Sequence, residues 1–509
     1  MIDRPVIDRL VIGSCESGRP VIDGRTRRFD PCRVLAGVFA LLLIGLVVGP
    51  RASFAQGDDE VVYPAERGLR GALARLGDRT LAAEHPDVLF TPASVQKLWV
   101  AAAALHFLGP EHRIVTRVVG AAPRGGVVAG DLVVLAEGDP TWSRHFFADA
   151  PRTPLLALAQ QLRERGARRV EGDLVVDVHA FPGRSFPPSR SIGDLAFGFA
   201  APLSALAVDD NSFWVRIAPG SRVGAPGRLE RITRGTADLE LAHHIVTVGA
   251  ERDGDGTVDF LPLWPTDPSA VGGFLVRGEY PLSEPSYRIE LGVPNGDAYA
   301  GEVLRGVLEA EGIEIAGRVR VETRRVLDAE PPAVLAHWES PPLARRLVPI
   351  LADSRNWHAE MLLRHVARNE TGAGRTVDGL ALLREFLEES VGLEPDHFVL
   401  DDASGVSPYN LLTPRAVVTL LEWARRQSWF SHFAAALASP GRGTLEAWPN
   451  LPPLRAKTGT LRGSLALAGY LEHPTSSEPV AFAIFLDHRP GERPPQRVEI
   501  ARWLRGLSY

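Results

Sequence analysis

Lysine is almost absent from this chain, and its two lysines lie where they could do acid–base chemistry. Of the 56 basic residues only Lys97 and Lys457 are lysine, and both belong to short motifs, Ser94-x-x-Lys97 and Lys457-Thr458-Gly459. An arginine side chain cannot lose its proton in a protein, whereas burial can turn a lysine amine into a base. Serine–lysine catalysis, in which the amine activates a hydroxyl, needs such a residue. These residue types therefore indicate nucleophilic catalysis by a serine.

The first motif has the spacing of neighbours on a helix. Ser94 and Lys97 are three positions apart, and the sequence LWVAAAALHFL that follows predicts a helix starting near Ser94, just after Pro92. There, Ser94 would be close to the positive end of the helix dipole and to free backbone N–H groups that can stabilise an oxyanion. A serine near a helix end beside a solvated lysine is the alternative, since S-x-x-K alone is common.

Two further motifs supply a hydroxyl, an amide and an ammonium group. Ser354-Arg355-Asn356 lies between two helical stretches, so its hydroxyl and amide can face one cleft, although Ser and Asn are also ordinary capping residues. Lys457-Thr458-Gly459-Thr460 precedes an expected strand. In an edge strand, a glycine allows close approach by an extended peptide, and the ammonium can face a carboxylate. Each motif alone is a weak signal.

Together and in this order, the three motifs resemble those of penicillin-binding proteins and serine β-lactamases. Over roughly residues 60–509 the surrounding sequence is similar to the D-alanyl-D-alanine carboxypeptidase/endopeptidase family, the class C low-molecular-mass penicillin-binding proteins. The 257 positions from Lys97 to Ser354 agree with the large insertion typical of that family. The chain departs from the usual family pattern, with effects expected on peripheral substrate contacts, at Arg355, Ala403, Pro408 and Trp448.

The resemblance implies a serine carboxypeptidase, with endopeptidase activity as an additional option, that forms an acyl-enzyme. The implied catalytic residues are the nucleophile Ser94, the general base Lys97 and the proton relay Ser354. Asn356 would hold the substrate amide, and Lys457 and Thr458 would bind the terminal carboxylate. The backbone N–H groups of Ser94 and Thr460 would form the oxyanion hole. The implied substrate-binding residues are Asn356, Lys457, Thr458, Gly459 and Thr460.

The expected fold class is α+β. The resemblance implies a penicillin-binding-protein/serine β-lactamase-like transpeptidase domain, an antiparallel sheet flanked by helices, with a large β-rich insertion. Residues 56–117 and 336–509 are expected to form the discontinuous catalytic domain, and residues 118–335 an inserted region of two subdomains. Helical periodicity in that region is confined to 153–166 and 298–312.

Shorter patterns place individual strands and a loop. The segment GDLVV occurs at 130–134 and again at 172–176, which indicates two strands but, at five residues, no repeat architecture. Asp401-Asp402 is expected to cap or shape a loop beside the cleft.

The N-terminal segment has the layout of a secretory signal. An apolar run at 34–49 follows an arginine-containing stretch, and Ser53-Phe54-Ala55 offers small residues for cleavage after residue 55. The run is shorter than the roughly 20 residues that comfortably span a bilayer, and a retained N-terminal anchor with loose membrane association is the alternative. Both cysteines, Cys15 and Cys32, precede the run, so lipidation is not indicated. We expect an exported protein of the periplasm or cell envelope.

Composition and the remaining motifs limit the partners. A net charge of −6 without a basic run argues against nucleic acid. His358 and His365 lack an H-E-x-x-H context, so neither a metal site nor a cofactor is expected. The resemblance implies peptidoglycan stem peptides ending in D-Ala-D-Ala as substrates and β-lactam antibiotics as covalent inhibitors. A β-lactamase or esterase, which would deacylate quickly, and a silent peptidoglycan-binding scaffold are the rival functions, and the oligomeric state is open.

Overall fold

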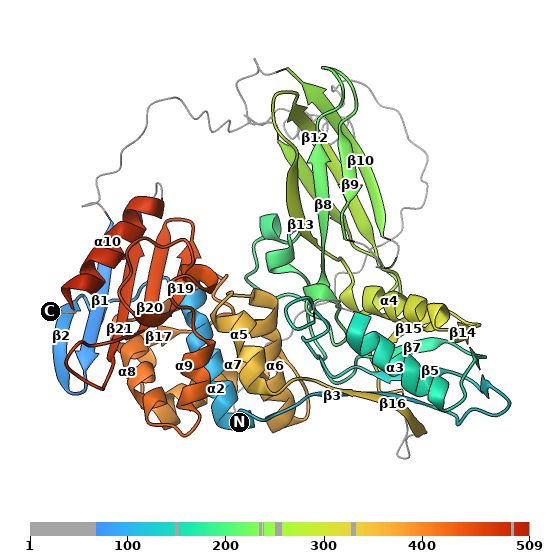
Figure 1. Ribbon diagram of the computed structural model, residues 1–509, viewed down its shortest axis with the longest axis horizontal. Coiled ribbons are helices and arrows are strands. Elements are labelled where there is room, and N and C mark those ends of the chain that lie inside the picture. The colour runs from blue at the N-terminus through green and yellow to red at the C-terminus, as the bar shows by residue number, and fades with distance from the viewer. Residues whose placement is uncertain are drawn as a thin grey trace, which may run out of the picture. The chain divides into compact units, whose positions relative to one another are not determined.

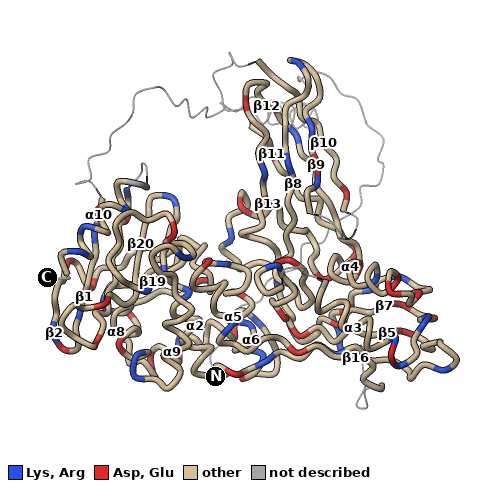
Figure 2. The backbone as a smooth tube through the Cα atoms, in the orientation of Figure 1, with Lys and Arg blue, Asp and Glu red and all other residues tan. Residues whose placement is uncertain are grey.

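The computed structural model describes most of the chain after the N-terminal segment, namely residues 68–147, 152–233, 237, 239–249, 257–326, 332–489 and 493–507. The expected signal or anchor, residues 1–55, lies outside the described residues. Within the described ranges, every helix is too short or too polar to cross a bilayer. Acidic and basic residues are interspersed along these ranges (Figure 2).

The two ends of the described chain build one five-stranded antiparallel sheet. The strand order β19-β20-β21-β1-β2 places the N-terminal hairpin beside the C-terminal strands (Figure 1). This confirms the expected antiparallel sheet, but strand β1, LRGALARL, has no β-branched residue and was not predicted. Pairing with β21 therefore decides its conformation. The strands are β1 Leu69–Leu76, β2 Arg79–Glu84, β19 Leu454–Leu461, β20 Ser464–Leu471 and β21 Val480–Asp487.

Both faces of this sheet are buried. Leu465 and Leu467 of β20 pack in the same cluster as Ile500 of helix α10, Arg493–Gly506. Ala466, on the opposite face, packs in a second cluster that is formed with the helices named below, which gives the expected α+β arrangement. Helix α7 continues into a π-helical turn, Phe386–Val391. The helices of this second cluster are α2 Lys97–Leu108, α5 Leu343–Leu351, α6 Asn356–Thr371, α7 Thr376–Glu385, α8 Pro414–Arg425 and α9 Phe430–Ala436.

A second five-stranded sheet, of order β15-β7-β5-β3-β16, begins where the chain leaves α2 and ends where it returns to α5. Its strands β3 and β16 pair antiparallel, whereas the two GDLVV segments become β5 and β7, which pair in parallel. Helices α3, Arg152–Glu164, and α4, Gly296–Ala310, confirm the two predicted helical patterns. The strands are β3 Val115–Gly120, β5 Leu132–Leu135, β7 Leu174–Asp177, β15 Val319–Glu322 and β16 Ala333–Glu339.

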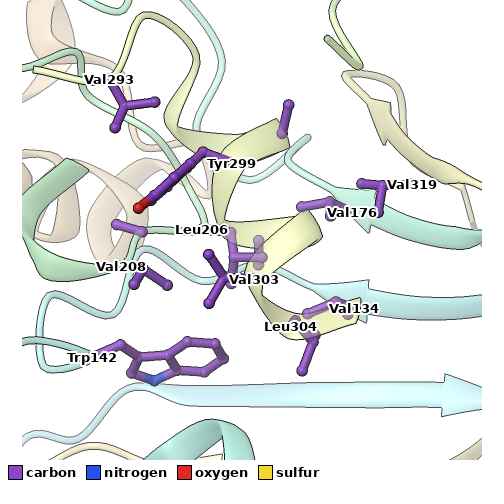
Figure 3. Packing of buried hydrophobic residues seen from close by; sticks show 14 of the residues in the cluster. Val134, Trp142, Val176, Leu206, Val208, Val293, Tyr299, Val303, Leu304 and Val319 are labelled. Atoms are coloured by element: carbon purple, nitrogen blue, oxygen red, sulfur yellow. The ribbon is translucent and has the colours of Figure 1, made fainter. Parts of the chain in front are cut away.

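One continuous core joins this sheet to the smaller sheets of the same region. Tyr299, Val303 and Leu304 of α4 lie in one buried cluster with Val134 of β5 and Val176 of β7 (Figure 3). The predicted number of inserted subdomains stays a prediction. The remaining strands are β4 Val127–Val128, β6 Arg169–Val170 and β14 Glu314–Ile315; β8 Ser212–Ala218, β9 Arg228–Arg231 and β13 Tyr287–Gly292; β10 Glu240–Val248, β11 Val258–Leu263 and β12 Gly273–Pro281; and β17 Phe398–Val399 and β18 Leu411–Leu412.

Candidate active site

Ser94 and Lys97 lie where a tight turn leads into a helix. Ser94 belongs to the 3₁₀ turn Ala93–Gln96, and α2 begins at Lys97, close to the predicted helix start. The Lys97 Nζ lies 2.8 Å from the Ser94 Oγ and 2.7 Å from the Asn356 Oδ1. It also lies 2.5 Å from the backbone oxygen of Ser404. The structure therefore brings three predicted residues together and adds Ser404, which the sequence did not single out.

Burial changes the protonation of Lys97. The side chain is fully buried, and this burial lowers the pKa of Lys97 to about 7, although the nearby carboxylates of Asp402 and Glu360 act to raise it. The positive charge of Arg190 lowers the same pKa further. Near neutral pH a large fraction of Lys97 is therefore an uncharged amine, which is the state that a general base requires.

The three contacts of Lys97 suit a neutral amine directed at Ser94. A neutral amine has two N–H donors and one lone pair, whereas the Asn356 Oδ1 and the Ser404 carbonyl oxygen can only accept. These two oxygens take the two N–H groups, and the lone pair then faces the Ser94 hydroxyl. The arrangement can thus accept a proton from Ser94.

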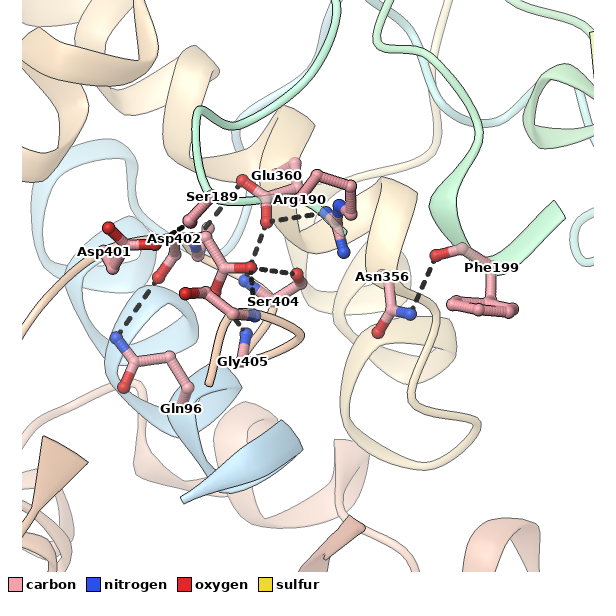
Figure 4. Close-up of polar contacts among 12 residues, drawn as sticks. Gln96, Ser189, Arg190, Phe199, Asn356, Glu360, Asp401, Asp402, Ser404 and Gly405 are labelled. Carbon is pink, nitrogen blue, oxygen red and sulfur yellow. Dashed lines mark hydrogen bonds and ion pairs between the residues drawn. The ribbon is translucent and has the colours of Figure 1, made fainter. Parts of the chain in front are cut away.

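A buried carboxylate holds the loop that carries Ser404. Asp402 accepts hydrogen bonds from the backbone N–H groups of Gly405, at 2.7 Å, and Ser407, at 3.0 Å, as expected for a residue that shapes a loop (Figure 4). Gly405 has a φ of +75°, and a Cβ there would lie 1.8 Å from the Ala93 oxygen, so the loop can pass beside the turn of Ser94 only as glycine.

A second buried carboxylate, Glu360 of α6, was missed by the sequence analysis. It accepts from the Ser404 N–H at 3.0 Å and lies 3.6 Å from the guanidinium of Arg190, which comes from the inserted region (Figure 4). Burial and the neighbouring charge of Asp402 raise the pKa of Glu360. The only sequence signal was a single acidic residue within the helical pattern NWHAEMLLRHVAR.

The second motif is held by the inserted region. Ser354 has a left-handed φ of +63°, which is strained for a serine, and Asn356 is the first residue of α6. Arg355 donates from its Nε and Nη2 to Asp210 at 3.0 and 2.8 Å, and the Asn356 amide donates to the Phe199 oxygen at 2.9 Å. The family departure at Arg355 therefore has a partner within the chain.

Asp210 is the centre of this attachment. His358 donates from its Nε2 to Asp210 at 2.8 Å, and the ring of His145 lies 3.4 Å away. Burial alone would raise the pKa of Asp210, but His358, His145 and Arg355 outweigh burial and hold that pKa well below its ordinary value. Asp209, Asp210 and Asn211 all have positive φ angles, which a tightly packed site can impose.

The two histidines of α6 have protein partners. His365 faces the backbone oxygen of Gly138 at 2.9 Å, while His358 contacts Asp210. Across the residues that the structure describes, no group of three or more His, Cys, Asp or Glu side chains is placed to hold a metal ion.

Replacing Asp210 by asparagine is expected to destabilise the fold by about 2–3 kcal/mol at pH 7, because Arg355 then keeps only Glu290, at 3.6 Å, as a counter-charge. The folded-state pKa of Asp210 is depressed. The difference in unfolding free energy between wild type and variant should therefore be largest above about pH 4, and it should shrink as the pH falls toward that pKa. Urea unfolding at several pH values measures it. Glu230→Gln, which breaks the exposed pair with Arg216, should cost less than about 1 kcal/mol. Equal losses in the two variants would contradict the buried role.

The third motif lies within strand β19 and precedes the predicted strand LALAGYLE, which forms β20. β19 is an edge strand, as predicted, because β20 is its only neighbour in the five-stranded sheet. Lys457 is fully buried, and its Nζ donates to the Thr458 oxygen at 2.8 Å. Burial and the charge of Lys97 lower the pKa of Lys457 well below its ordinary value.

Gly459 brings β19 against the turn that carries Ser94. A Cβ at position 459 would lie 2.3 Å from the oxygen of Pro92, so a larger residue would push the strand away from Ser94. The first and third motifs are therefore adjacent because of backbone packing, which short-range sequence patterns do not encode.

A pocket of about 290 Å³ opens beside the two serines. Lys97, Asn356 and Lys457 are absent from its wall, although Lys97 contacts Ser94 and Asn356 contacts Lys97. Thr444 and Arg497 were missed by the sequence analysis, and Trp448 had been noted only as a family departure. The lining residues are Ser94, Ser354, Thr444, Trp448, Thr458, Thr460 and Arg497.

The chain is similar to D-Ala-D-Ala carboxypeptidases along most of its length. It is 31% identical over 422 residues to a D-alanyl-D-alanine carboxypeptidase of Actinomadura sp. (strain R39), covering 79% of this chain and 74% of that protein. It is 26% identical over 419 residues to the D-alanyl-D-alanine carboxypeptidase DacB of Haemophilus influenzae, covering 81% of this chain and 83% of that protein.

The fold has a solved counterpart. The crystal structure of penicillin binding protein 4 (dacB) from Haemophilus influenzae matches with a TM-score of 0.77 and 23% identity, covering 87% of this chain and 97% of that one. A sequence model of one peptidase family matches residues 75–507, a range that holds all three motifs and the pocket. With motifs, fold and relatives in agreement, the chain belongs to the D-Ala-D-Ala carboxypeptidase 3 (S13) family.

Proposed function

We propose that the protein is an exported serine D-alanyl-D-alanine carboxypeptidase that cleaves peptidoglycan stem peptides through an acyl-enzyme. The single observation that carries this proposal is the Lys97 amine, buried, with a pKa near 7 and 2.8 Å from the Ser94 hydroxyl at the pocket. Family membership supports the substrate class. Endopeptidase cleavage of peptide crosslinks is part of the proposal, because it breaks the same kind of bond.

In the proposed reaction the Ser94 Oγ attacks the carbonyl carbon of the penultimate D-alanine while Lys97 takes the hydroxyl proton. The backbone N–H groups of Ser94 and Thr460 stabilise the oxyanion. Collapse of the tetrahedral intermediate breaks the C–N bond, Ser354 passes a proton to the leaving amine, and free D-alanine departs. Water then hydrolyses the ester of Ser94, which restores the hydroxyl.

The substrate is held by residues around the same pocket. Asn356 binds the substrate amide, Lys457 supports β19 by donating to the Thr458 oxygen, and Gly459 keeps the strand close to Ser94. Residues 56–117 and 336–509 act as the catalytic domain, and residues 118–335 buttress it through the contacts of Asp210 and Arg190.

The proposed location is the periplasm or cell envelope, where the proposed substrate lies. The apolar run at 34–49 supports export, either with cleavage after residue 55 or with a retained anchor that gives loose membrane association. β-Lactams are proposed as covalent inhibitors, and a Haemophilus influenzae relative has been crystallised in complex with a β-lactam.

Incubating the protein with a peptide ending in D-Ala-D-Ala is expected to release one D-alanine per peptide, and prior treatment with penicillin should stop the release. Chromatography of the released amino acid measures the rate. The same peptide ending in L-Ala-L-Ala should not be cleaved. If the folded protein releases no D-alanine and its penicillin label is quickly lost, a β-lactamase is favoured. If the folded protein shows neither release nor labelling, a silent scaffold is favoured.

A further inference from the structure

The pocket beside Ser94 has a positive charge in its wall that no motif predicted. Arg497 belongs to α10, close to the C-terminal end of the chain, yet it lines the pocket with Ser94, Ser354, Thr458 and Thr460. Of the described residues that line this pocket, no other carries a charge. A C-terminal helix therefore contributes to the space in which the peptide bond would be cleaved.

The guanidinium of Arg497 is held but not neutralised. Its Cζ lies 5.6 Å from the centre of the Trp448 ring, which places the cation over an aromatic face that also lines the pocket. Glu499, the acidic residue two positions away, is already paired with Arg70 and Arg489. Among the described residues, no acidic side chain forms an ion pair with Arg497.

One donor of this guanidinium is buried without a partner. The Nε–H of Arg497 is buried from solvent and makes no hydrogen bond to a described residue. Leaving a buried donor unpaired is costly, so such a group is expected to have a partner in the working state. An anion entering the pocket would supply that partner.

The two lysines are less suited to meet that anion. The Nζ of Lys457 is buried and donates to the Thr458 oxygen, and Lys97 faces Ser94, Asn356 and Ser404. Neither lysine lines the pocket. Arg497 of α10 is therefore an alternative to Lys457 as the group that faces a terminal carboxylate.

We propose that Arg497 binds the carboxylate of the leaving D-amino acid, assisted by the hydroxyl groups of Thr458 and Thr460. The inference rests on the proposed function, in which this carboxylate is attached to the carbon beside the released amine. A guanidinium offers two N–H groups in a planar fork that matches a carboxylate, and stacking on Trp448 keeps that fork oriented. Arg497 is then a specificity-determining residue that favours substrates with a free carboxylate.

The test compares a peptide ending in D-Ala-D-Ala with the same peptide ending in D-alaninamide. Wild type should prefer the carboxylate peptide. Arg497→Gln should lower kcat/KM for that peptide about 10- to 100-fold, mainly through KM, and leave the rate on the amide unchanged. Arg497→Lys should recover part of the preference, because it restores the charge without the fork.

Two further measurements keep the outcomes separate. Arg502→Gln, an exposed arginine on the same helix, should leave both substrates unaffected, and thermal unfolding should show that each variant is folded. If Arg497→Gln keeps the full carboxylate preference, or slows both peptides equally, the role of Arg497 is wrong while the proposed function stands. If wild type cleaves neither peptide, the proposed function fails, and the role of Arg497 fails with it.

Discussion

Ser94→Ala is expected to abolish covalent labelling by a fluorescent penicillin and to reduce D-alanine release by roughly 10⁵- to 10⁶-fold. The substitution removes the only atom of Ser94 that faces the Lys97 amine, at 2.8 Å, and leaves the two other acceptors of that amine in place. The fold should therefore persist while the nucleophile is lost. Denaturing gel electrophoresis after incubation with the labelled penicillin, with intact-mass analysis of the adduct, measures the effect.

A matched serine provides the control for this experiment. Ser191 is exposed and lies in the inserted region, so Ser191→Ala should label like wild type. Ser354 also lines the pocket, and a labelled Ser94→Ala protein would mean that Ser354 or another hydroxyl is the nucleophile. A band that persists for many minutes in wild type would argue against a β-lactamase, whose acyl-enzyme must turn over quickly.

Lys97→Arg should slow acylation by about 10²- to 10⁴-fold, the range that a general base contributes. A guanidinium keeps its proton at every accessible pH, so it cannot accept the hydroxyl proton of Ser94. The larger guanidinium must also fit into a fully buried site, where the single Nζ of Lys97 lies between the oxygens of Asn356 and Ser404. Thermal unfolding separates loss of the base from loss of the fold.

The pH dependence of the wild type gives an independent readout of the same group. Because burial lowers the pKa of Lys97 to about 7, the second-order rate of penicillin labelling should fall about tenfold per pH unit well below pH 7. Above that pH the amine is mostly neutral, and the rate should level off. An active Lys97→Arg enzyme with an unchanged pH profile would exclude Lys97 as the base.

The proposed catalytic pair was visible in the sequence because the contact between its two residues is local. Ser94 and Lys97 are three positions apart at a helix start, so their proximity follows from helix geometry alone. The periodic patterns of α3 and α4 were equally local and were placed correctly. Strand β1 was missed, since a strand of alanine, leucine, glycine and arginine is specified by its pairing with β21.

The residues that tune and complete the site could not be found in this way. Glu360, Asp210 and Arg497 belong to three separate elements, and each resembles an ordinary surface charge when read along the chain. Only the packing of α6, the inserted region and α10 shows that Glu360 binds the loop of Ser404, that Asp210 binds Arg355, and that Arg497 lines the pocket. The pKa of Lys97 likewise depends on burial and on distant charges, neither of which a motif contains.

By itself the sequence determined the three motifs, the family they resemble, the α+β class and the proximity of Ser94 to Lys97, because these depend on residue types at short spacing. The tertiary structure alone decided that Lys457 lies within β19 behind the pocket, that Asp210 secures Arg355, and that Arg497 enters the pocket wall. Contacts between residues more than a hundred positions apart arise from sheet pairing and core packing, and those interactions are specified by the whole chain rather than by any local pattern.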